Sequence, residues 1–292
     1  MRILLTGANG QVGTEIKRQG NGLALTSLDK HALDITDRAA VMDTFAVHKP
    51  TMVINAAAYT AVDKAETEPE LAFNINQEGS LNLALACQKF KIPLIHLSTD
   101  YIFDGTKTSP YHEDDRACPI GVYAQSKWEG EQVIRKTIDQ HLILRVSWVF
   151  GRQGQNFVKT ILRLAQEREI LTVVADQFGA PTYANNIAET VLALTTQLKQ
   201  NPAFGTYHYT NAPTTTWHAF ATAIVQTAQP YYSLKTTTIQ PIKTEDFPTK
   251  AKRPSNSCLD CAKIASVFNI QQQSWQLGLQ ALIKALANDV ST

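Results

Sequence analysis

The residues of this sequence that are best spaced for proton transfer are a tyrosine and a lysine near the middle of the chain. Tyr123 and Lys127 are four positions apart in the segment Tyr-Ala-Gln-Ser-Lys, so a helix would present both side chains on one face. A tyrosine with its ordinary pKa of about 10 is a poor proton carrier at neutral pH. A lysine ammonium one turn away favours the phenolate and lowers that pKa. We therefore expect Tyr123 to act as a general acid whose pKa is lowered by Lys127.

A threonine hydroxyl is predicted to lie at the same place in the fold. The apolar segment 92–97 is typical of a buried strand and leads directly into Ser98, Thr99 and Asp100. In open α/β sheets, ligands bind at the carboxyl ends of the parallel strands. There the Thr99 hydroxyl could donate a hydrogen bond to the carbonyl oxygen of a substrate.

Three glycines near the N-terminus form a second chemical signal. Gly7, Gly10 and Gly13 join an apolar strand at residues 3–5 to a predicted helix at residues 11–20. Glycines in such a turn allow a tight bend, close approach of a pyrophosphate to the backbone, and close packing of helix on strand. The helix N-terminus adds free N–H groups and the positive end of the helix dipole. The spacing G-x-x-G-x-x-G differs from the commoner G-x-G-x-x-G, but its position between a strand and a helix predicts a dinucleotide site.

The second predicted strand ends at an acid that suits the adenosine ribose of a dinucleotide. Asp29 lies 22 residues after Gly7, near the separation of about 20 expected for the acid that bonds the 2′-hydroxyl. A carboxylate there favours NADH and opposes the 2′-phosphate of NADPH, whereas Lys30 and His31 could offset that repulsion. The choice between NADPH and NADH therefore stays open. Lys127 is expected to hold the hydroxyls of the nicotinamide ribose.

The hydrophobic pattern predicts the elements that would bring these residues together. Short apolar runs alternate with helical patterns in the first half of the chain. They predict strands at residues 3–5, 23–28, 52–54, 92–97 and 142–146, and helices at 11–20, 36–48, 71–90 and 122–139. Parallel strands need crossover connections, so this alternation predicts an α/β fold with a doubly wound parallel sheet of the Rossmann type, covered by helices on both faces.

The pattern loosens in the second half. Helices are predicted at residues 156–168, 185–198, 217–229 and 274–287, separated by stretches rich in Pro and Thr. We expect residues 1–150 to form an NAD(P)-binding domain. Residues 151–292 should form a smaller C-terminal region that mainly binds substrate, is partly interleaved with the first domain, and returns strands to its sheet.

The composition excludes several other classes of protein. With 27 Lys+Arg against 26 Asp+Glu, the chain has no basic field for binding nucleic acid or an anionic membrane. No apolar run reaches the ~20 residues of a membrane helix, and the first residues lack the pattern of a secretory leader, so we expect a cytoplasmic protein. Cys258 and Cys261 have C-x-x-C spacing but no second ligand pair, so no metal site is predicted.

Five longer blocks of sequence narrow the prediction. With the glycine turn and the set of Thr99, Tyr123 and Lys127, they make the chain similar to the extended short-chain dehydrogenases/reductases. Within that group the chain resembles the dTDP-4-dehydrorhamnose reductase family. The blocks are residues 55–66 (NAAAYTAVDKAE), 98–105 (STDYIFDG), 145–150 (RVSWVF), 176–182 (DQFGAPT) and 253–257 (RPSNS). The resemblance covers nearly the whole chain, and the last three blocks are specific to this family.

The resemblance implies an oxidoreductase that uses NADPH or NADH to reduce the C4 ketone of dTDP-4-dehydro-L-rhamnose. The product would be dTDP-L-rhamnose, at the last step of a biosynthesis that feeds polysaccharides. It implies Tyr123 as the proton donor, Lys127 as its pKa-lowering, ribose-holding partner and Thr99 as the hydroxyl that polarises the ketone. The implied coenzyme contacts are Gly7, Gly10, Gln11, Val12, Gly13, Asp29, Asp34, Ile35, Ala57, Ala58, Tyr59, Tyr123 and Lys127. The implied substrate contacts are Thr60, Val62, Thr99, Asp100, Tyr101 and Trp148 at the sugar, and Asn156, Arg253 and Asn256 at the diphosphate. By residue type, Trp148 offers an apolar wall to a deoxysugar, and Asn156 is equally suited to cap a helix.

Other functions share the fold and are kept as alternatives. One is another nucleotide-sugar reductase or an epimerase. A 4,6-dehydratase would need a second carboxylate after Thr99 and Asp100, where this chain has Tyr101, and that argues against elimination. Another is a non-catalytic protein similar to the regulatory beta subunit of methionine adenosyltransferase.

The resemblance also raises the question of a metal ion. Some members of the dTDP-4-dehydrorhamnose reductase family place magnesium at a dimer interface, and Glu15 lies where one ligand could be, but no set of further ligands is identified. A homodimer is an expectation to be tested.

Overall fold

A parallel six-stranded sheet forms the centre of the molecule. The computed structural model describes residues 1–290. Its main sheet has the strand order β10-β5-β4-β3-β1-β2, with every neighbouring pair parallel. The strands are β1 (Arg2–Thr6), β2 (Ala24–Leu28), β3 (Met52–Asn55), β4 (Leu94–Thr99), β5 (His141–Val146) and β10 (Gly205–His208). The strand order reverses between β1 and β3, which is the point where doubly wound sheets bind dinucleotides. The prediction of a doubly wound parallel sheet is confirmed.

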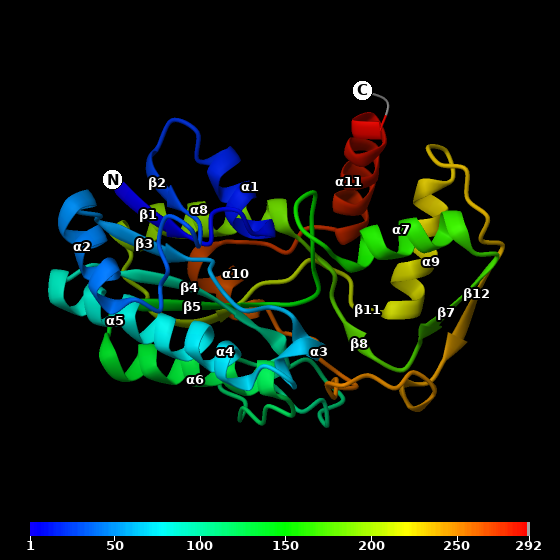
Figure 1. Cartoon of the computed structure of the whole chain (residues 1–292), viewed down its shortest axis with the longest axis horizontal. Helices are drawn as coiled ribbons and strands as arrows, with labels where there is room; N and C mark the ends of the chain where they lie inside the picture. The colour runs from blue at the N-terminus through cyan, green and yellow to red at the C-terminus, as the bar shows by residue number, and fades with distance from the viewer. Residues whose placement is uncertain (291–292) are drawn as a thin grey trace.

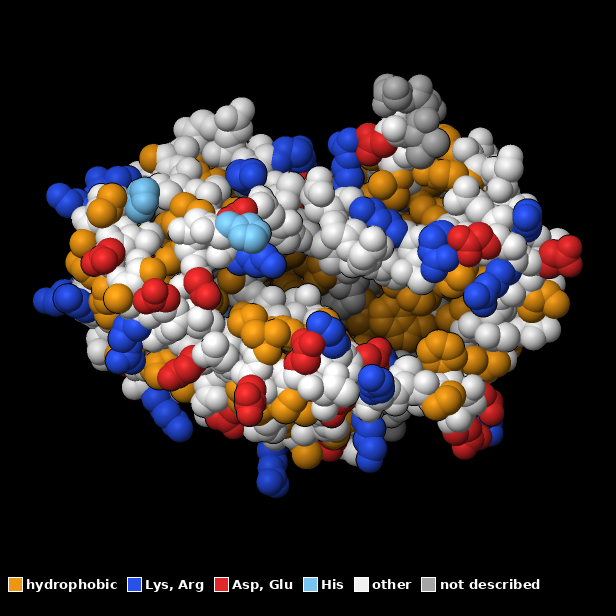
Figure 2. Space-filling view, viewed as in Figure 1, with side chains coloured by type: hydrophobic (Ala, Val, Ile, Leu, Met, Phe, Trp, Pro, Cys, Tyr) orange, Lys and Arg blue, Asp and Glu red, His pale blue; other side chains and the backbone are white. Residues whose placement is uncertain are grey.

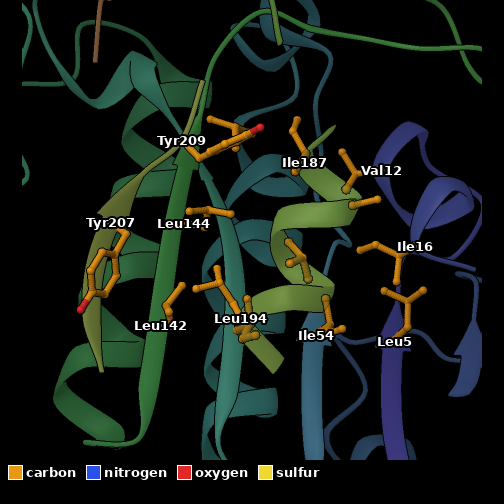
Figure 3. Close-up of a cluster of buried hydrophobic side chains, with 14 of the residues drawn as sticks. Leu5, Val12, Ile16, Ile54, Leu142, Leu144, Ile187, Leu194, Tyr207 and Tyr209 are labelled. Atoms are coloured by element: carbon orange, nitrogen blue, oxygen red, sulfur yellow. The ribbon is translucent and has the colours of Figure 1, made fainter. Parts of the chain in front are cut away.

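Helices cover both faces of this sheet (Figure 1). The covering helices are α1 (Gln11–Gln19), α2 (Arg38–His48), α5 (Gly79–Phe90), α6 (Val122–Thr137) and α8 (Ala184–Gln200). Side chains alternate along each strand, so Leu4 of β1 packs with α2 and α5, whereas Ile3 and Leu5 pack with α1 and α8. Figure 3 shows the second of these layers. There, Val12, Ile16, Ile187 and Leu194 point onto the sheet residues Leu5, Ile54, Leu142 and Leu144.

The remaining elements form a second body beside the carboxyl edge of the sheet (Figure 1). Its core is built from α7 (Phe157–Glu167), β7 (Ile170–Val174), α9 (Trp217–Ala228) and α11 (Trp275–Val290), and β12 (Thr238–Ile242) pairs with β7 in parallel. Short strands connect the two bodies, namely β6 (Val149–Phe150), β8 (Phe178–Gly179), β9 (Thr182–Tyr183) and β11 (Thr215–Thr216). From the second half of the chain, β10 joins the edge of the main sheet and α8 packs against α1.

One predicted helix is interrupted. The segment 71–90 divides into α4 (Pro69–Phe73), a π-helical turn η1 (Asn74–Glu78) and α5. The turn is held by Asn76, whose Oδ1 accepts from the Tyr59 N–H at 2.9 Å and whose Nδ2 donates to the Ser126 hydroxyl at 2.9 Å. Helix α6 approaches so closely that a Cβ on Gly130 would lie 2.3 Å from the Asn76 carbonyl oxygen. The π turn therefore fixes the position of α6, a role that periodicity cannot reveal.

Shorter elements complete the chain. They are α3 (Val62–Ala65), the 3₁₀ turns η2 (Asp100–Ile102) and η3 (Thr244–Asp246), and α10 (Ala262–Phe268). Between residues 1 and 290, no helix combines the length and the apolar character needed to cross a bilayer.

Candidate functional site

Three predicted residues meet where β4 ends and α6 begins. Thr99 is the last residue of β4, and its hydroxyl accepts from the Tyr101 N–H at 3.2 Å and donates to Asp100 Oδ1 at 3.0 Å. Tyr123 lies in the first turn of α6, near enough for the Thr99 hydroxyl to lower the pKa of Tyr123. The ring of Tyr101 meets the ring of Tyr123 edge to face, with 6.2 Å between centroids. The sheet edge therefore places Thr99 beside Tyr123, as the sequence predicts.

Lys127 lies one turn further along α6 but points toward the sheet. Its Nζ donates to the Leu97 carbonyl oxygen at 2.7 Å and lies 3.4 Å from His96 Nε2. Burial lowers the pKa of Lys127 to about 8, although the Glu131 carboxylate opposes the shift. An uncharged amine is therefore accessible at only slightly alkaline pH.

The prediction that Lys127 lowers the pKa of Tyr123 is wrong for this arrangement. Burial raises the pKa of Tyr123 to about 12, and the nearby Thr99 hydroxyl offsets only part of that rise. The physical reason is that desolvation penalises the phenolate, while Lys127 directs its Nζ at Leu97 and His96. Tyr123 is thus held as a protonated phenol at neutral pH.

Asp100 is the most perturbed carboxyl of the site. It is 2% exposed, and its Oδ2 has no hydrogen-bond partner among the described residues. Burial raises the pKa of Asp100 to about 7. The hydroxyls of Ser257 and Thr99 oppose that shift, although the Ser257 hydroxyl donates its hydrogen bond to the Phe178 carbonyl oxygen at 3.4 Å. The site therefore contains a buried carboxyl oxygen that has no hydrogen-bond partner among the described residues.

A cleft of about 450 Å³ lies over the glycine turn. Gly7 has φ +71°, and a Cβ there would lie 2.5 Å from the backbone of Ala56 and Ala57. A Cβ on Gly13 would lie 2.1 Å from the Gly7 carbonyl oxygen. Glycine is therefore required at both positions for the turn and for the packing of α1. Seven predicted coenzyme residues line this cleft, namely Gly7, Gly10, Asp29, Asp34, Ile35, Ala57 and Ala58.

Other predicted coenzyme residues have different positions. The Val12 side chain packs into the core under α1, which leaves its backbone for a ligand. Gln11 begins α1, and its Oε1 accepts from Asn156 at 2.9 Å. Tyr59 directs its hydroxyl to Glu68 Oε2 at 2.9 Å. These three residues surround the cleft without forming its lining.

Asp29 is oriented at the rim of this cleft. Its Oδ1 accepts from the backbone N–H groups of His31 and Ala32, each at 3.0 Å, and its Oδ2 accepts from Asn9 Nδ2 at 2.5 Å. The Ala32 bond is the main cause that lowers the pKa of Asp29 below its usual value. The carboxylate therefore stays ionised, with Lys30 and His31 beside it in the lining.

A second cavity of about 590 Å³ lies between the two bodies and reaches Tyr101. Its lining is largely apolar side chains of α7 and β7, closed by Trp217, Phe247 and Arg253. Figure 2 shows this face hollowed to the right of centre, with hydrophobic side chains on the floor of the hollow. Such a cavity suits a ligand with an extended apolar or planar part.

Trp148 is fixed beside this cavity by stacking. Its backbone has φ +44°, an unusual conformation for a tryptophan, and its ring stacks on Trp217 with centroids 3.5 Å apart. On the β8–β11 ladder, Gly179 lies so close that a Cβ there would be 2.3 Å from the Trp148 ring. The ring is therefore confined by Gly179 and Trp217.

The three predicted diphosphate residues are separated by the structure. Arg253 lines the second cavity and forms a bidentate ion pair with Asp63, at 2.7 and 3.1 Å. Asn256 is buried and donates to the carbonyl oxygens of Lys107 and Ser109, at 2.6 and 3.1 Å, so it holds a loop. Asn156 is the N-cap of α7, accepting from the Lys159 N–H at 3.2 Å, and its Nδ2 reaches the glycine turn through Gln11.

The remaining predicted sugar contacts, Thr60 and Val62, lie outside the linings of both cavities. Thr60 is exposed and Val62 begins α3, which carries Asp63 toward Arg253. Sequence reasoning missed Asp63, His96 and Asn76 as parts of the site. The first two lie within or beside sequence blocks already singled out, whereas Asn76 had no signal because its role depends on a π turn.

No metal centre is evident in the described part of the chain. Within residues 1–290, no group of three or more His, Cys, Asp or Glu side chains is arranged to hold a metal ion. Glu15 forms an ion pair with Arg18 at 2.9 Å. Cys258 and Cys261 are both buried free thiols.

Comparison with known proteins places this geometry in one family. The family model described as the RmlD substrate binding domain matches residues 1–288. A dTDP-4-dehydrorhamnose reductase of Aggregatibacter actinomycetemcomitans is 43% identical over 285 residues, which cover 96% of this chain and 97% of the relative. A dTDP-4-dehydrorhamnose reductase structure from Clostridium acetobutylicum has a TM-score of 0.91 at 36% identity and covers 98% of this chain and 99% of that one. The Bacillus anthracis enzyme, solved in complex with NADP, has a TM-score of 0.89 at 36% identity, covering 97% and 99%. Matched over nearly its whole length in sequence and in structure, this chain belongs to the dTDP-4-dehydrorhamnose reductase family.

Proposed function

We propose that this chain reduces the C4 ketone of dTDP-4-dehydro-L-rhamnose with NADPH or NADH, giving dTDP-L-rhamnose as the last step of dTDP-rhamnose biosynthesis. The observation that carries the proposal is that Thr99, at the end of β4, and Tyr123, in the first turn of α6, lie side by side at the carboxyl edge of the sheet. One cleft of nucleotide size lies over the glycine turn, and a second cavity reaches Tyr101 beside the pair.

The first cleft fits the adenosine and pyrophosphate of a nicotinamide coenzyme. The glycine turn has no room for a Cβ at Gly7 or Gly13, so its backbone N–H groups can approach a pyrophosphate closely. Asp29 would bond the adenosine ribose, and Lys127 the nicotinamide ribose. When bound, the coenzyme supplies the hydride. The relative from Bacillus anthracis was solved with NADP, which supports this assignment.

The proton would come from Tyr123. Because burial keeps its pKa at about 12, the hydroxyl is protonated throughout the physiological range and can donate to the oxygen of a ketone as that oxygen gains charge. The Thr99 hydroxyl donates to Asp100 Oδ1 in this structure and would turn its single hydrogen to the ketone oxygen, giving that oxygen a second donor.

The second cavity would take the sugar nucleotide. Asp100 offers its unpaired Oδ2 to a sugar hydroxyl, and the confined ring of Trp148 offers an apolar wall to a deoxysugar. Arg253 would use the part of its guanidinium that is not engaged by Asp63 on the diphosphate. The largely apolar far end of the cavity suits a base.

The alternatives are less well supported. A dehydratase would need a second acid at Tyr101, and an epimerase would need tightly retained coenzyme. A non-catalytic partner protein has no need for Thr99 and Tyr123 to lie side by side.

Two further assignments accompany this proposal, and the oligomeric state is left to an experiment. We assign residues 1–150 mainly to coenzyme binding and residues 151–292 mainly to substrate binding, supported by the residues that line the two clefts. We place the reaction in the cytoplasm, where nicotinamide coenzymes and nucleotide sugars are available. Sedimentation velocity on the purified protein decides between a monomer and a homodimer.

The test is coenzyme oxidation by the purified protein with enzymatically generated dTDP-4-dehydro-L-rhamnose. We expect loss of NADPH or NADH absorbance together with formation of dTDP-L-rhamnose. Tyr123→Phe should abolish turnover and leave coenzyme binding nearly unchanged, and Tyr231→Phe, at a half-exposed tyrosine on the second body, should behave as wild type. Turnover retained by Tyr123→Phe, or no product from the wild type although coenzyme binds, would refute the proposal.

A further inference from the structure

A chain of four buried polar side chains runs beneath the site. It begins at Thr6, whose hydroxyl donates to Asn55 Oδ1 at 2.8 Å. Asn55 Nδ2 then faces His96 Nδ1 at 3.0 Å, and His96 Nε2 faces Lys127 Nζ at 3.4 Å. All four residues are at most 2% exposed, so water cannot rearrange these bonds freely.

The backbone fixes which way the Asn55 amide points. The Ala57 N–H can only donate, and it lies 3.0 Å from Asn55 Oδ1. The side-chain oxygen is therefore on that side, and the Nδ2 amide hydrogens face His96. His96 Nδ1 must accept, so the neutral ring carries its proton on Nε2.

This tautomer turns a donor toward Lys127. An ammonium has only hydrogens to offer, so it meets the Nε2–H of His96 donor to donor. A neutral amine can instead accept from Nε2–H while still donating to the Leu97 carbonyl oxygen at 2.7 Å. We propose that His96, locked by Asn55 as its Nε2–H tautomer, is a positioning residue that favours the uncharged form of Lys127 and so sets the pH range in which the enzyme works. The inference rests on the proposed role of Lys127 in the reaction.

Four other titratable or charged side chains surround His96 and Lys127, namely Glu131, Arg135, Arg145 and His141. On α6, Glu131 favours the ammonium of Lys127, but its carboxylate is bound by Arg145 of β5 at 2.8 Å and by Arg135 at 2.8 Å. On β5, His141 pairs with Leu94, two residues from the position opposite His96, and still disfavours a positive charge on His96. Burial and the Lys127 charge lower the pKa of His96 well below its usual value, in agreement with a neutral ring.

The first test reads the tautomer without measuring activity. Nuclear magnetic resonance of isotope-labelled histidine in the whole protein distinguishes a protonated from an unprotonated ring nitrogen, and His96→Gln identifies the His96 signals. We expect Nδ1 to be unprotonated and Nε2 protonated at neutral pH. The opposite tautomer, or a doubly protonated ring, would overturn the proposal even if the enzyme proves to be the proposed reductase.

The second test uses an isosteric substitution to exchange the donor and acceptor roles between residue 55, His96 and Lys127. In Asn55→Asp, one oxygen still accepts from Ala57 and Thr6, while the other accepts from His96 Nδ1–H. Nε2 then becomes an acceptor for the Lys127 ammonium. We expect the alkaline limb of the kcat profile to move to higher pH by about one unit, with the inverted tautomer in the spectrum. His141→Gln, the matched change on the next strand, should leave the limb in place.

The outcomes test the role of His96 and the role of Lys127 separately. An inverted tautomer with an unmoved alkaline limb would refute the role of His96 in setting the charge of Lys127. Full turnover by Lys127→Met would instead refute the proposed role of Lys127 itself. If Asn55→Asp fails to fold, the wild-type tautomer still decides whether His96 faces Lys127 with a donor.

Discussion

Replacing Asp100 with asparagine should make the protein more stable, and by more at neutral than at acidic pH. Asp100 is buried, one of its carboxyl oxygens has no partner, and its pKa rises from 3.8 to about 7 because burial penalises the charge. A carboxyl with a raised folded-state pKa binds its proton more tightly in the folded state. Its favourable contribution is fully present below the unfolded-state pKa and is lost as the pH rises through the folded-state value.

The magnitude follows from the size of the shift. A rise from 3.8 to about 7 corresponds to about 4 kcal/mol at pH values above both. About 2 kcal/mol of this penalty develops between pH 5 and pH 7. Asparagine resembles the protonated carboxyl and carries no titrating group. The free energy of unfolding of Asp100→Asn minus that of wild type should therefore increase by about 2 kcal/mol over this interval.

Urea unfolding followed by tryptophan fluorescence at several pH values from 5 to 7.5 measures this difference. Asp104→Asn is the matched control, because hydrogen bonds from Thr106 hold the pKa of Asp104 below its usual value. That carboxyl is ionised in both states across the interval, so its difference from wild type should be flat. A flat difference for Asp100→Asn as well would refute the reasoning that Asp100 is buried with an unsatisfied oxygen.

Three further substitutions test the two clefts. Gly179→Ala places a Cβ 2.3 Å from the Trp148 ring and should lower kcat/KM for the sugar nucleotide about tenfold without changing coenzyme affinity. A kcat/KM equal to that of the wild type would show that Trp148 does not need its confined position. Arg253→Lys removes the bidentate pairing with Asp63 and should raise the KM for the sugar nucleotide about tenfold in steady-state kinetics, and an unchanged KM would place the diphosphate elsewhere. Asp29→Ala removes the carboxylate at the ribose and should raise the ratio of kcat/KM with NADPH to kcat/KM with NADH, whereas a constant ratio would count against the assignment.

The sequence predicted the parts of this structure that depend on local pattern. Apolar runs alternating with helices are enough to identify parallel strands, and the carboxyl edge of the sheet follows from their direction. Thr99 and Tyr123 could be brought together from the sequence because one ends a strand and the other begins the helix that follows it in space. Gly7 and Gly13 could be interpreted because a strand and a helix flank them.

What the sequence could not predict depends on contacts between distant segments. The pairing of Asp63 with Arg253 joins residues that are 190 positions apart. The stacking of Trp148 on Trp217 depends on the β8–β11 ladder, two residues long, which leaves no periodic signal. The direction of Lys127 was missed for a different reason. Helical spacing gives the face of a side chain, but the acceptor that captures its end, here the Leu97 carbonyl oxygen, comes from the sheet.

Burial of Tyr123 and Asp100 keeps the site in the protonation state that reduction requires. Reduction of a ketone consumes a proton, so the enzyme needs its acid protonated before the hydride arrives. Burial holds Tyr123 as a phenol, with its pKa at about 12, and keeps a large fraction of Asp100 protonated near pH 7. Oxidation of the alcohol would instead need a phenolate, which burial disfavours and which Lys127 does not stabilise while it is bonded to Leu97. The same desolvation that raises the pKa of Tyr123 thus prepares the site for proton donation.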